Sequence, residues 1–219
     1  MRTLLHAIIG IILLSGLLLT GCGNQPSTAT KDPLAFVEKI EKGEAFVKRA
    51  GETTFNAASV KAQLHEGDIV KTGDTGEVVI RFATGAVARV LAKSEYQLKE
   101  RKVATTGQNV VYTRLVTGVA AFYVPKDAEA AKKFEVETER AVASIKGTTF
   151  KLADDGSTTT LSVGEGTVNF TAKAGGKSVD VAEMYRVSAN ATGLSEPEKF
   201  NTLMDPDLAG AEEIMKGTR

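Results

Sequence analysis

The stretch "EVVIRFATGAVARVLA" (residues 77–92) gives the clearest indication of the fold class. Apolar residues recur with a period of two in residues 77–83 and again in residues 86–92, and Val, Ile and Phe suit a pleated, half-buried surface. The short turn at residues 83–86 contains a glycine and is tight enough to join two antiparallel strands. The stretch therefore predicts a β-hairpin.

The same period continues from Phe36 to about Ser188. Further strands are expected in residues 134–138, 158–163, 167–172 and 179–187. Glycine-bearing turns at residues 154–157, 164–166 and 174–177 are each expected to close an antiparallel hairpin. About a dozen short strands without helices between them favour an all-β sandwich or barrel over a parallel α/β sheet.

Two segments break this pattern. Residues 126–133 have a helix-forming composition but are too short to be stable alone, which predicts a surface loop with one helical turn. Residues 195–217 begin with a capping serine and a proline, are interrupted at Asp205 and Pro206, and end at a glycine. They predict a two-part helical tail, whose docking residues are expected to be Phe200, Leu203, Met204, Leu208 and Ile214.

The N-terminus has the three parts of a secretory signal peptide. Arg2 supplies a positive charge, residues 4–19 supply the apolar segment, and the small residues Thr20 and Gly21 precede Cys22. A membrane-spanning helix needs about 20 apolar residues to cross roughly 30 Å of hydrocarbon. This run is shorter and is broken by glycine and serine, so an uncleaved anchor is the weaker alternative.

The only cysteine of the chain, Cys22, follows directly after Leu19, Thr20 and Gly21. These four residues resemble the lipobox of bacterial lipoproteins, which implies that the thiol is lipidated and the signal is cut before it. Two or three acyl chains hold a protein firmly on a bilayer, whereas the alternative is a free cysteine left by chance. Gly23 favours the outer membrane if the host has two membranes. Residues 23–33 are polar and predict a flexible linker.

Length and charge limit the number of domains and the classes of partner that can be expected. The 219 residues suffice for one sizeable core, and 27 basic side chains balance 27 acidic ones without a run of either sign. No nucleic-acid partner is expected. The predicted organisation is a signal peptide (1–21), a lipidated linker (22–33), a β-sandwich domain (34–191) and a helical tail (192–219).

Several blocks, in order, resemble the FecR domain, the extracytoplasmic module of iron-citrate signalling proteins. They are "QLHEGDIVKTGDTGEVVIRFATG" (63–85), "LVTGVAAFYV" (115–124), "FEVETERAVASIKGTTFKL" (134–152) and "LSVGEGTVNF" (161–170). The resemblance covers roughly residues 36–190 and implies an all-β antiparallel sandwich of jelly-roll-like form. Signalling members carry a cytoplasmic anti-sigma segment, which we do not expect here, so direct regulation of a sigma factor is not expected either.

The chain departs from the family pattern at three positions. Thr84 and Ala86 stand where the family often has an acidic residue and a serine, and Lys146 stands where it often has an arginine. Lysine lacks the planar fork with which arginine makes bidentate contacts. Lys146 and Thr148 are nevertheless weak candidates for ligand binding. The alternative is that Gly147 allows a close approach of two strands beside a solvated lysine.

Most candidate chemical groups have a structural alternative. His65, Glu66, Asp68 and Asp74 fall within ten residues, where a weak calcium site or catalysis competes with carboxylates that cap turns. The latter is the preferred interpretation. The acid pairs Glu135/Glu137 and Asp154/Asp155 are interpreted as solubilising groups rather than a glycosidase pair. Of two neighbouring aromatic residues that could meet a sugar, Phe122 and Tyr123, alternation requires one to face the core.

The sequence thus predicts a membrane-tethered lipoprotein of the cell envelope whose FecR-like domain binds an envelope protein or glycan without enzymatic activity. No catalytic residue, cofactor or metal ligand is assigned, since no nucleophile–base pair or zinc spacing is present. The alternative is a sensor of a small molecule or carbohydrate that acts through a separate membrane protein.

Overall fold

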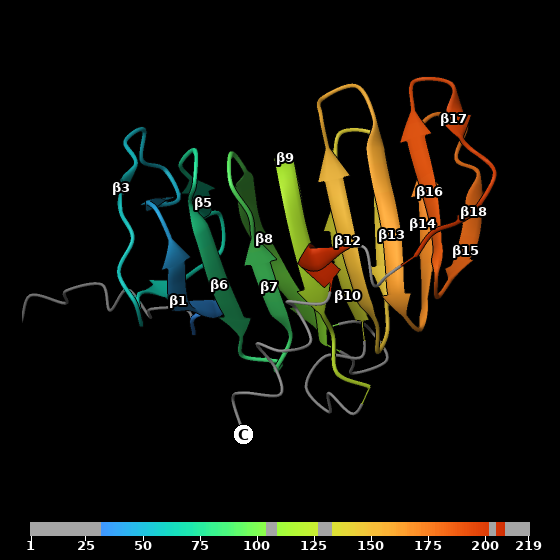
Figure 1. The fold of residues 1–219 in the computed structure, drawn as a ribbon. Coiled ribbons are helices and arrows are strands. Elements are labelled where there is room, and N and C mark those ends of the chain that lie inside the picture. The colour runs from blue at the N-terminus through green and yellow to red at the C-terminus, as the bar shows by residue number, and fades with distance from the viewer. Residues whose placement is uncertain (1–31, 104–108, 127–132, 202–204, 209–219) are drawn as a thin grey trace, which may run out of the picture. The chain divides into compact units, whose positions relative to one another are not determined.

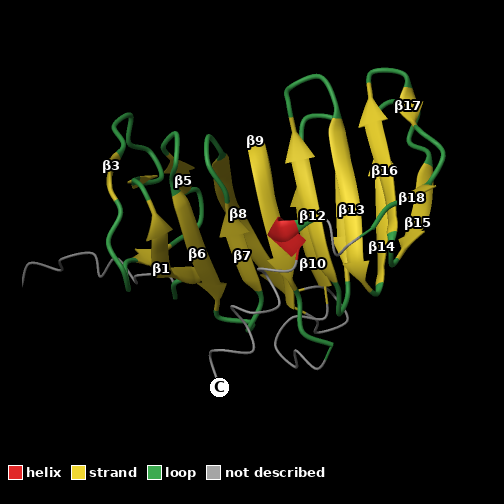
Figure 2. Ribbon diagram, in the orientation of Figure 1, coloured by secondary structure: helices red, strands yellow, loops and turns green. Residues whose placement is uncertain are grey.

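The computed structural model describes residues 32–103, 109–126, 133–201 and 205–208, all within one compact unit, Lys31–Arg219. These residues are almost entirely strands, and a single helical turn occupies residues 206–208 (Figure 2). The strands, in chain order (Figure 1), are β1 Ala35–Lys42, β2 Ala45–Lys48, β3 Asn56–Ala57, β4 Gln63–Leu64, β5 Ile69–Thr72, β6 Glu77–Phe82, β7 Val87–Val90, β8 Glu95–Val103, β9 Asn109–Tyr123, β10 Lys133–Glu137, β11 Ala141–Ile145, β12 Thr149–Asp154, β13 Thr159–Glu165, β14 Thr167–Ala172, β15 Ser178–Ala182, β16 Tyr185–Asn190, β17 Gly193–Leu194 and β18 Glu198–Lys199.

The strands form two layers. Sheet A has the order β4, β1, β6, β7, β9, β12, β13, β16, with β17 and β18 both beside β16. Sheet B has the order β3, β2, β5, β8, β9, β10, β11, β14, β15. The predicted all-β sandwich is therefore confirmed. One described pair, β9 with β10, is parallel, so the sandwich is antiparallel except at this point.

Strand β9 belongs to both sheets. Its first part pairs with β8 and β10 in sheet B, and its last part, from Gly118, pairs with β7 and β12 in sheet A. Gly118 has φ +91°, a conformation that side chains disfavour. A Cβ atom there would lie 2.2 Å from Ser94 Oγ, which itself accepts a 2.8 Å hydrogen bond from Val119 N. The crossing between sheets thus depends on the absence of a side chain.

The core lies between the sheets and contains their inward-facing apolar side chains. Phe122 of β9 stacks on Phe150 of β12 with ring centroids 4.8 Å apart. Across the layers, the ring of Phe82 in sheet A meets that of Phe134 in sheet B edge-on at 5.1 Å. Such aromatic pairs add about 0.5–1.5 kcal/mol beyond the area they bury, so this cluster fastens the layers together.

Three of the four predicted hairpins are confirmed, and one is wrong. The turns at residues 83–86, 154–157 and 174–177 join paired neighbours, namely β6 with β7, β12 with β13 and β14 with β15. The turn at residues 164–166 instead leads from β13 in sheet A to β14 in sheet B. Gly166, with φ +87°, lets the chain pass Gly147 O and Thr148 closely at this point.

The single strand predicted in residues 179–187 is two strands in the structure, because Met184 has φ +63° and interrupts the extended conformation.

The C-terminal prediction is partly wrong. Residues 193–199 are not helical, because β17 and β18 extend sheet A beside β16. The helical turn at residues 206–208 carries Leu208, which is buried, and Phe200 is half-buried. Leu203, Met204 and Ile214 lie outside the described residues, as does most of the predicted loop at 126–133.

The described residues contain no helix that is long and apolar enough to span a bilayer. The predicted signal peptide, Cys22 and nearly all of the linker lie outside them.

Candidate functional site

Asp68 is a structural carboxylate. It is 2% exposed, and it accepts hydrogen bonds of 3.0 Å from the backbone amides of Ala50 and His65. Arg49 Nη1 lies 2.6 Å from its Oδ2 and also donates to Gln63 O. The carboxylate therefore closes the turn before β5 and holds a neighbouring loop against it, as the preferred interpretation requires.

The other acidic residues close to Asp68 in the sequence have different surroundings. Glu66 Oε1 accepts a hydrogen bond from Arg101 N, and the Asp74 side chain is 92% exposed. No group of three or more His, Cys, Asp or Glu side chains with metal-binding geometry occurs in the part of the chain that the structure describes. The structure does not gather these residues into one site.

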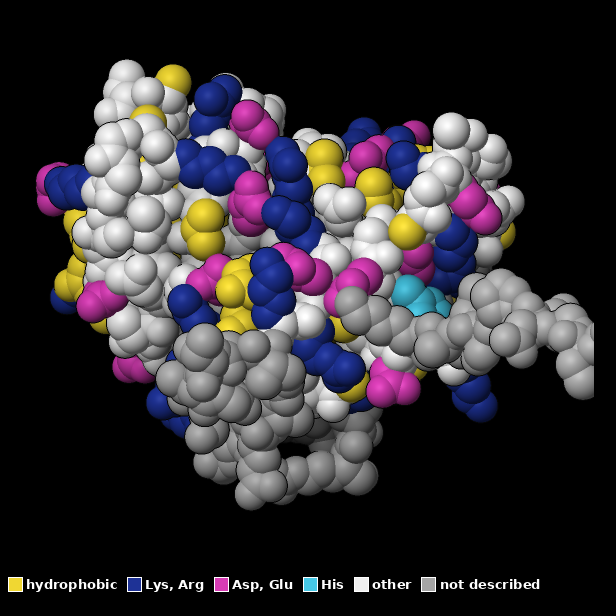
Figure 3. All heavy atoms as spheres, turned by 180° about the vertical axis from the view of Figure 1, so that it is seen from behind, with side chains coloured by type: hydrophobic (Ala, Val, Ile, Leu, Met, Phe, Trp, Pro, Cys, Tyr) yellow, Lys and Arg dark blue, Asp and Glu magenta, His cyan; other side chains and the backbone are white. Residues whose placement is uncertain are grey.

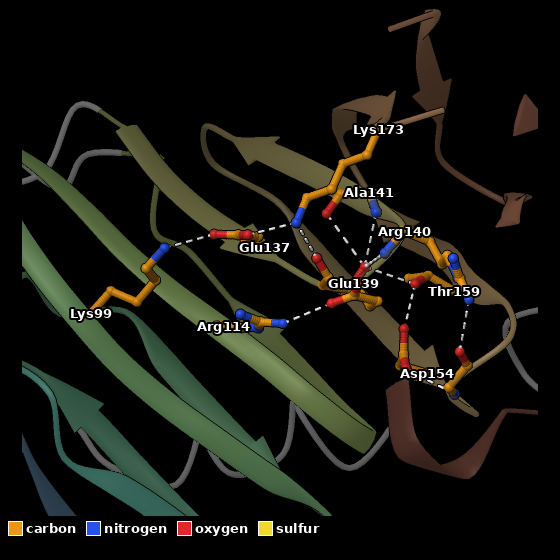
Figure 4. Close-up of polar contacts among 11 residues, drawn as sticks. Lys99, Arg114, Glu137, Glu139, Arg140, Ala141, Asp154, Thr159 and Lys173 are labelled. Atoms are coloured by element: carbon orange, nitrogen blue, oxygen red, sulfur yellow. Dashed lines mark hydrogen bonds and ion pairs between the residues drawn. The ribbon is translucent and has the colours of Figure 1, made fainter. Parts of the chain in front are cut away.

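Glu137 lies between two lysines (Figure 4). Its carboxylate is 2.6 Å from Lys173 Nζ and 2.8 Å from Lys99 Nζ. Partial burial raises the pKa of Glu137, but the hydrogen bonds and charges of both lysines outweigh this and lower the pKa to about 2. Its companion, Glu135, pairs with Lys133 at 2.6 Å and accepts a hydrogen bond from Ser144 Oγ. Both carboxylates are thus engaged in links between strands.

The second acid pair, Asp154 and Asp155, divides into two roles. Asp155 accepts hydrogen bonds from the Ser157 hydroxyl and from the backbone amides of Ser157 and Thr158, which lower its pKa. Asp154 is buried and accepts from Thr159 Oγ1, which in turn meets Thr138 Oγ1 at 2.7 Å (Figure 4). Asp154 is therefore not a solubilising group, because its chain of hydrogen bonds joins sheet A to the β10–β11 turn of sheet B.

The outer face of sheet B is a broad polar surface. Figure 3 views the molecule from behind and shows basic and acidic side chains interspersed across the middle of this face. Many of the charges form ion pairs, either between strands, as in Lys71–Glu95 at 2.7 Å, or between a strand and the β10–β11 turn, as in Arg114–Glu139 at 2.9 Å. The face also carries Tyr112, whose ring centroid lies 5.5 Å from Lys102 Nζ. We call this surface the sheet-B face.

A cavity of about 320 Å³ lies at the end of sheet A. Its walls are Tyr123, Val124, Pro125, Lys126, Gly147, Thr148, Thr149 and Glu165. The volume is at the lower end of the range of small-ligand pockets, roughly 300–1,000 Å³. We call this feature the strand-end cavity.

The two predicted ligand-binding residues have different positions relative to the strand-end cavity. Thr148 lines it, but its hydroxyl already contacts Thr167 O at 3.2 Å and Lys146 O at 3.3 Å. Lys146 is exposed and is not among the lining residues. Gly147 does make a close approach, but to Lys126, which follows β9, and not between two strands: a Cβ there would lie 2.6 Å from Lys126 Cγ.

Sequence reasoning missed Lys126, Thr149 and Glu165 in this cavity. Alternation along β9 places Phe122 in the core and Tyr123 on the outer side, where it lines the cavity. The same alternation along β12 would have placed Thr149 outward beside it. Tyr123, Thr149 and Glu165 come together only because β12 pairs with both β9 and β13. The sequence does not show which strands pair.

These features define a two-layer all-β domain with a polar cavity at one end and a charge-paired face. Residues 68–169 match the family model described as FecR protein, so this part of the chain is similar to the FecR domain. The match runs from the beginning of β5 into β14 and contains every residue of the strand-end cavity.

Two solved structures share this fold. Both are crystal structures, at 1.65 and 2.50 Å resolution, of a protein from Parabacteroides distasonis ATCC 8503 that is described as a proposed anti-sigma factor. The TM-score is 0.52 for each, with sequence identities of 15% and 16%. The alignments cover 63% of this chain and 62% of theirs, so the likeness concerns the fold over less than two thirds of either protein. No curated protein matches the chain.

Proposed function

We propose that this protein is a non-enzymatic binding module of the cell envelope that takes part in signalling by contacting another envelope macromolecule, a protein or a glycan. The observation that carries the proposal is the sheet-B face. It spans strands from β5 to β14, and its charges pair with one another across strands and turns rather than converging on a cleft. Interspersed charges give a macromolecular partner many points of electrostatic complementarity.

The paired charges also favour binding over catalysis. A carboxylate that acts as a general acid or general base needs a pKa suited to proton transfer near the working pH. Glu137 has a pKa of about 2 because of its two lysines, and such a group stays ionised and accepts hydrogen bonds only. The FecR match and the fold shared with a proposed anti-sigma factor support a regulatory role.

The membrane tether is a separate part of the proposal. We place it at Cys22, where the lipobox resemblance implies lipidation. Acyl chains would hold the domain at the envelope, on the outer membrane facing the periplasm or the cell surface if the host has two membranes. Tethering raises the local concentration of the sheet-B face, so that weak contacts become occupied.

Site-specific crosslinking in intact cells tests the sheet-B face. A photo-crosslinking phenylalanine analogue replaces Tyr112, which lies on this face, and in a matched protein replaces Arg186, which lies in β16 of sheet A. We expect a discrete crosslinked product of higher mass from position 112 and none from position 186. Products from position 186 alone would contradict the proposal.

The strand-end cavity favours a second candidate function, a sensor of a small molecule or carbohydrate. A sensor is stabilised by its ligand according to the ligand concentration relative to Kd. A thermal shift with one small molecule, together with no crosslink from position 112, would favour it over the macromolecular binder.

A further inference from the structure

Three strands present one row of side chains to the strand-end cavity. Thr149 of β12 is in register with Tyr123 of β9 on one side and with Glu165 of β13 on the other. Lys126 and Gly147 close the end of this row, because the chain passes close to Gly147 there. Central strands of a sheet fix this arrangement, so the site is formed before any ligand arrives.

The hydroxyl of Thr149 is buried without a partner. Thr149 is 2% exposed, and its Oγ1 is hydrogen-bonded to no atom of the described residues. A buried polar group in this state is unfavourable, because it has lost its hydrogen bonds to water and gained none from the protein. Its neighbour Thr148, by contrast, has its hydroxyl between two carbonyl oxygens. An oxygen-bearing ligand in the cavity would provide the hydrogen bond that Thr149 lacks.

The charges of the cavity favour a neutral ligand. Lys126 Nζ lies 2.9 Å from Glu165 Oε1, and this hydrogen bond raises the pKa of Lys126. The carboxylate of Glu165 would therefore repel an anion that approached the ammonium group. The ammonium group of Lys126 would likewise repel a cation that approached the carboxylate. The pair still has unused ammonium hydrogens and carboxylate lone pairs, which suit hydroxyl groups that both donate and accept.

The remaining wall is aromatic. Tyr123 is half-buried and lines the cavity, and a tyrosine ring offers an apolar face together with a polar end. A ligand that matches this set has an apolar ring face, several hydroxyls and no net charge. We infer that the strand-end cavity binds a saccharide, with Tyr123 against the ring and with Thr149, Lys126 and Glu165 on its hydroxyls. This inference rests on the second candidate function, the sensor, and names the class of its ligand; the sheet-B face is a different surface of the molecule.

Calorimetry and NMR on the full chain test the saccharide site. The protein is kept in a detergent without a sugar headgroup and titrated with maltotetraose, cellotetraose and the tetramer of N-acetylglucosamine. Inorganic phosphate and free lysine serve as charged probes. We expect at least one tetrasaccharide to bind and to shift the resonances of Gly147 and Thr149, with no saturable binding of either charged probe. No binding by all three, or stronger binding of a charged probe, would overturn the inference.

Two substitutions connect binding to the named side chains. Thr149→Val removes only the unpartnered hydroxyl, so we expect a melting temperature at or above that of the wild type and about 2- to 10-fold weaker binding. Thr149→Ser keeps a hydroxyl and should retain most of the affinity. Tyr123→Ala should weaken binding about tenfold or more.

The matched control is Tyr112→Ala, which removes a tyrosine from the sheet-B face. It should leave saccharide binding unchanged, and crosslinking from position 112 is measured separately on the protein that carries the analogue, so the two proposals can fail independently. Equal affinity in the wild type, Thr149→Val and Tyr123→Ala would overturn the assignment of the site.

Discussion

Asp68 is a carboxylate whose structural role depends on burial. Its hydrogen-bond partners are two backbone amides, Ala50 N and His65 N, and the guanidinium of Arg49. Asp74 belongs to the same cluster in sequence but is fully at the surface, 3.9 Å from Lys93 Nζ. Residue type and spacing could not show which of these two carboxylates is buried, because burial depends on which turn the rest of the fold packs against.

Asp68→Asn is expected to destabilise the domain by about 2–4 kcal/mol, because the amide loses the charge that faces Arg49 and offers a donor where acceptors are needed. Asp74→Asn is the matched control and should change stability by no more than about 0.5 kcal/mol. Urea denaturation followed by circular dichroism measures both. Equal effects would show that the contacts of Asp68 add little.

Gly147→Val combines strain with a clash. Its φ of +67° disfavours a β-branched side chain, and a Cβ would lie 2.6 Å from Lys126 Cγ. We expect a loss of about 2–4 kcal/mol.

Gly156→Val separates the two causes, because Gly156 has φ +87° but no atom within 4 Å of its Cβ position. Strain alone should cost about 1–2 kcal/mol there. If thermal denaturation gave the same loss for both variants, the close approach of Lys126 would not contribute.

At the scale of elements, period-two alternation located most strands because it reports which face of a strand is buried. It could not reveal which strands pair. The turn at residues 164–166 has the glycines of a hairpin yet leads to the other sheet, because its conformation depends on packing against Gly147. The helix prediction for the C-terminal tail was partly wrong for a related reason, since the free edge of β16 pairs with residues 193–194 and 198–199 as short strands. Local composition there favoured a helix, and tertiary pairing overrode it.

Glu137 connects three elements and gives them a pH dependence. It joins Lys99 of β8 and Lys173, which follows β14, to the end of β10. Its pKa falls from an ordinary value of 4.5 to about 2 on folding. A carboxyl of this kind stabilises the fold above its unfolded pKa, and the contribution is lost as pH falls through the folded pKa.

Glu137→Gln should therefore remove part of the loss of stability between about pH 5 and pH 2. The side chain is half-buried and its two ion pairs lie at the surface, so screening by solvent limits the expected difference at neutral pH to about 1 kcal/mol. Glu139→Gln breaks one ion pair with Arg114 and serves as the control. Urea midpoints across this pH range check the prediction, and parallel curves for the wild type and Glu137→Gln would contradict it.

At the scale of the whole molecule, Cys22→Ser tests the tether. If lipid is the main membrane affinity, the variant should move from the membrane fraction to the soluble or unprocessed fraction. Fractionation followed by mass spectrometry of the N-terminus measures this. Unchanged mass and unchanged detergent partitioning would contradict lipidation.

The passage of β9 through both layers makes the sandwich a single cooperative unit. Neither sheet can open along this strand without breaking hydrogen bonds to β7, β8, β10 or β12. Partial unfolding is therefore expected to begin at outer strands such as β15 and β18. The central amides of β9 should exchange with deuterium only through global unfolding, at the free energy of the whole domain. A pulling force applied through a lipid tether would therefore act on both sheets together and would not separate one from the other.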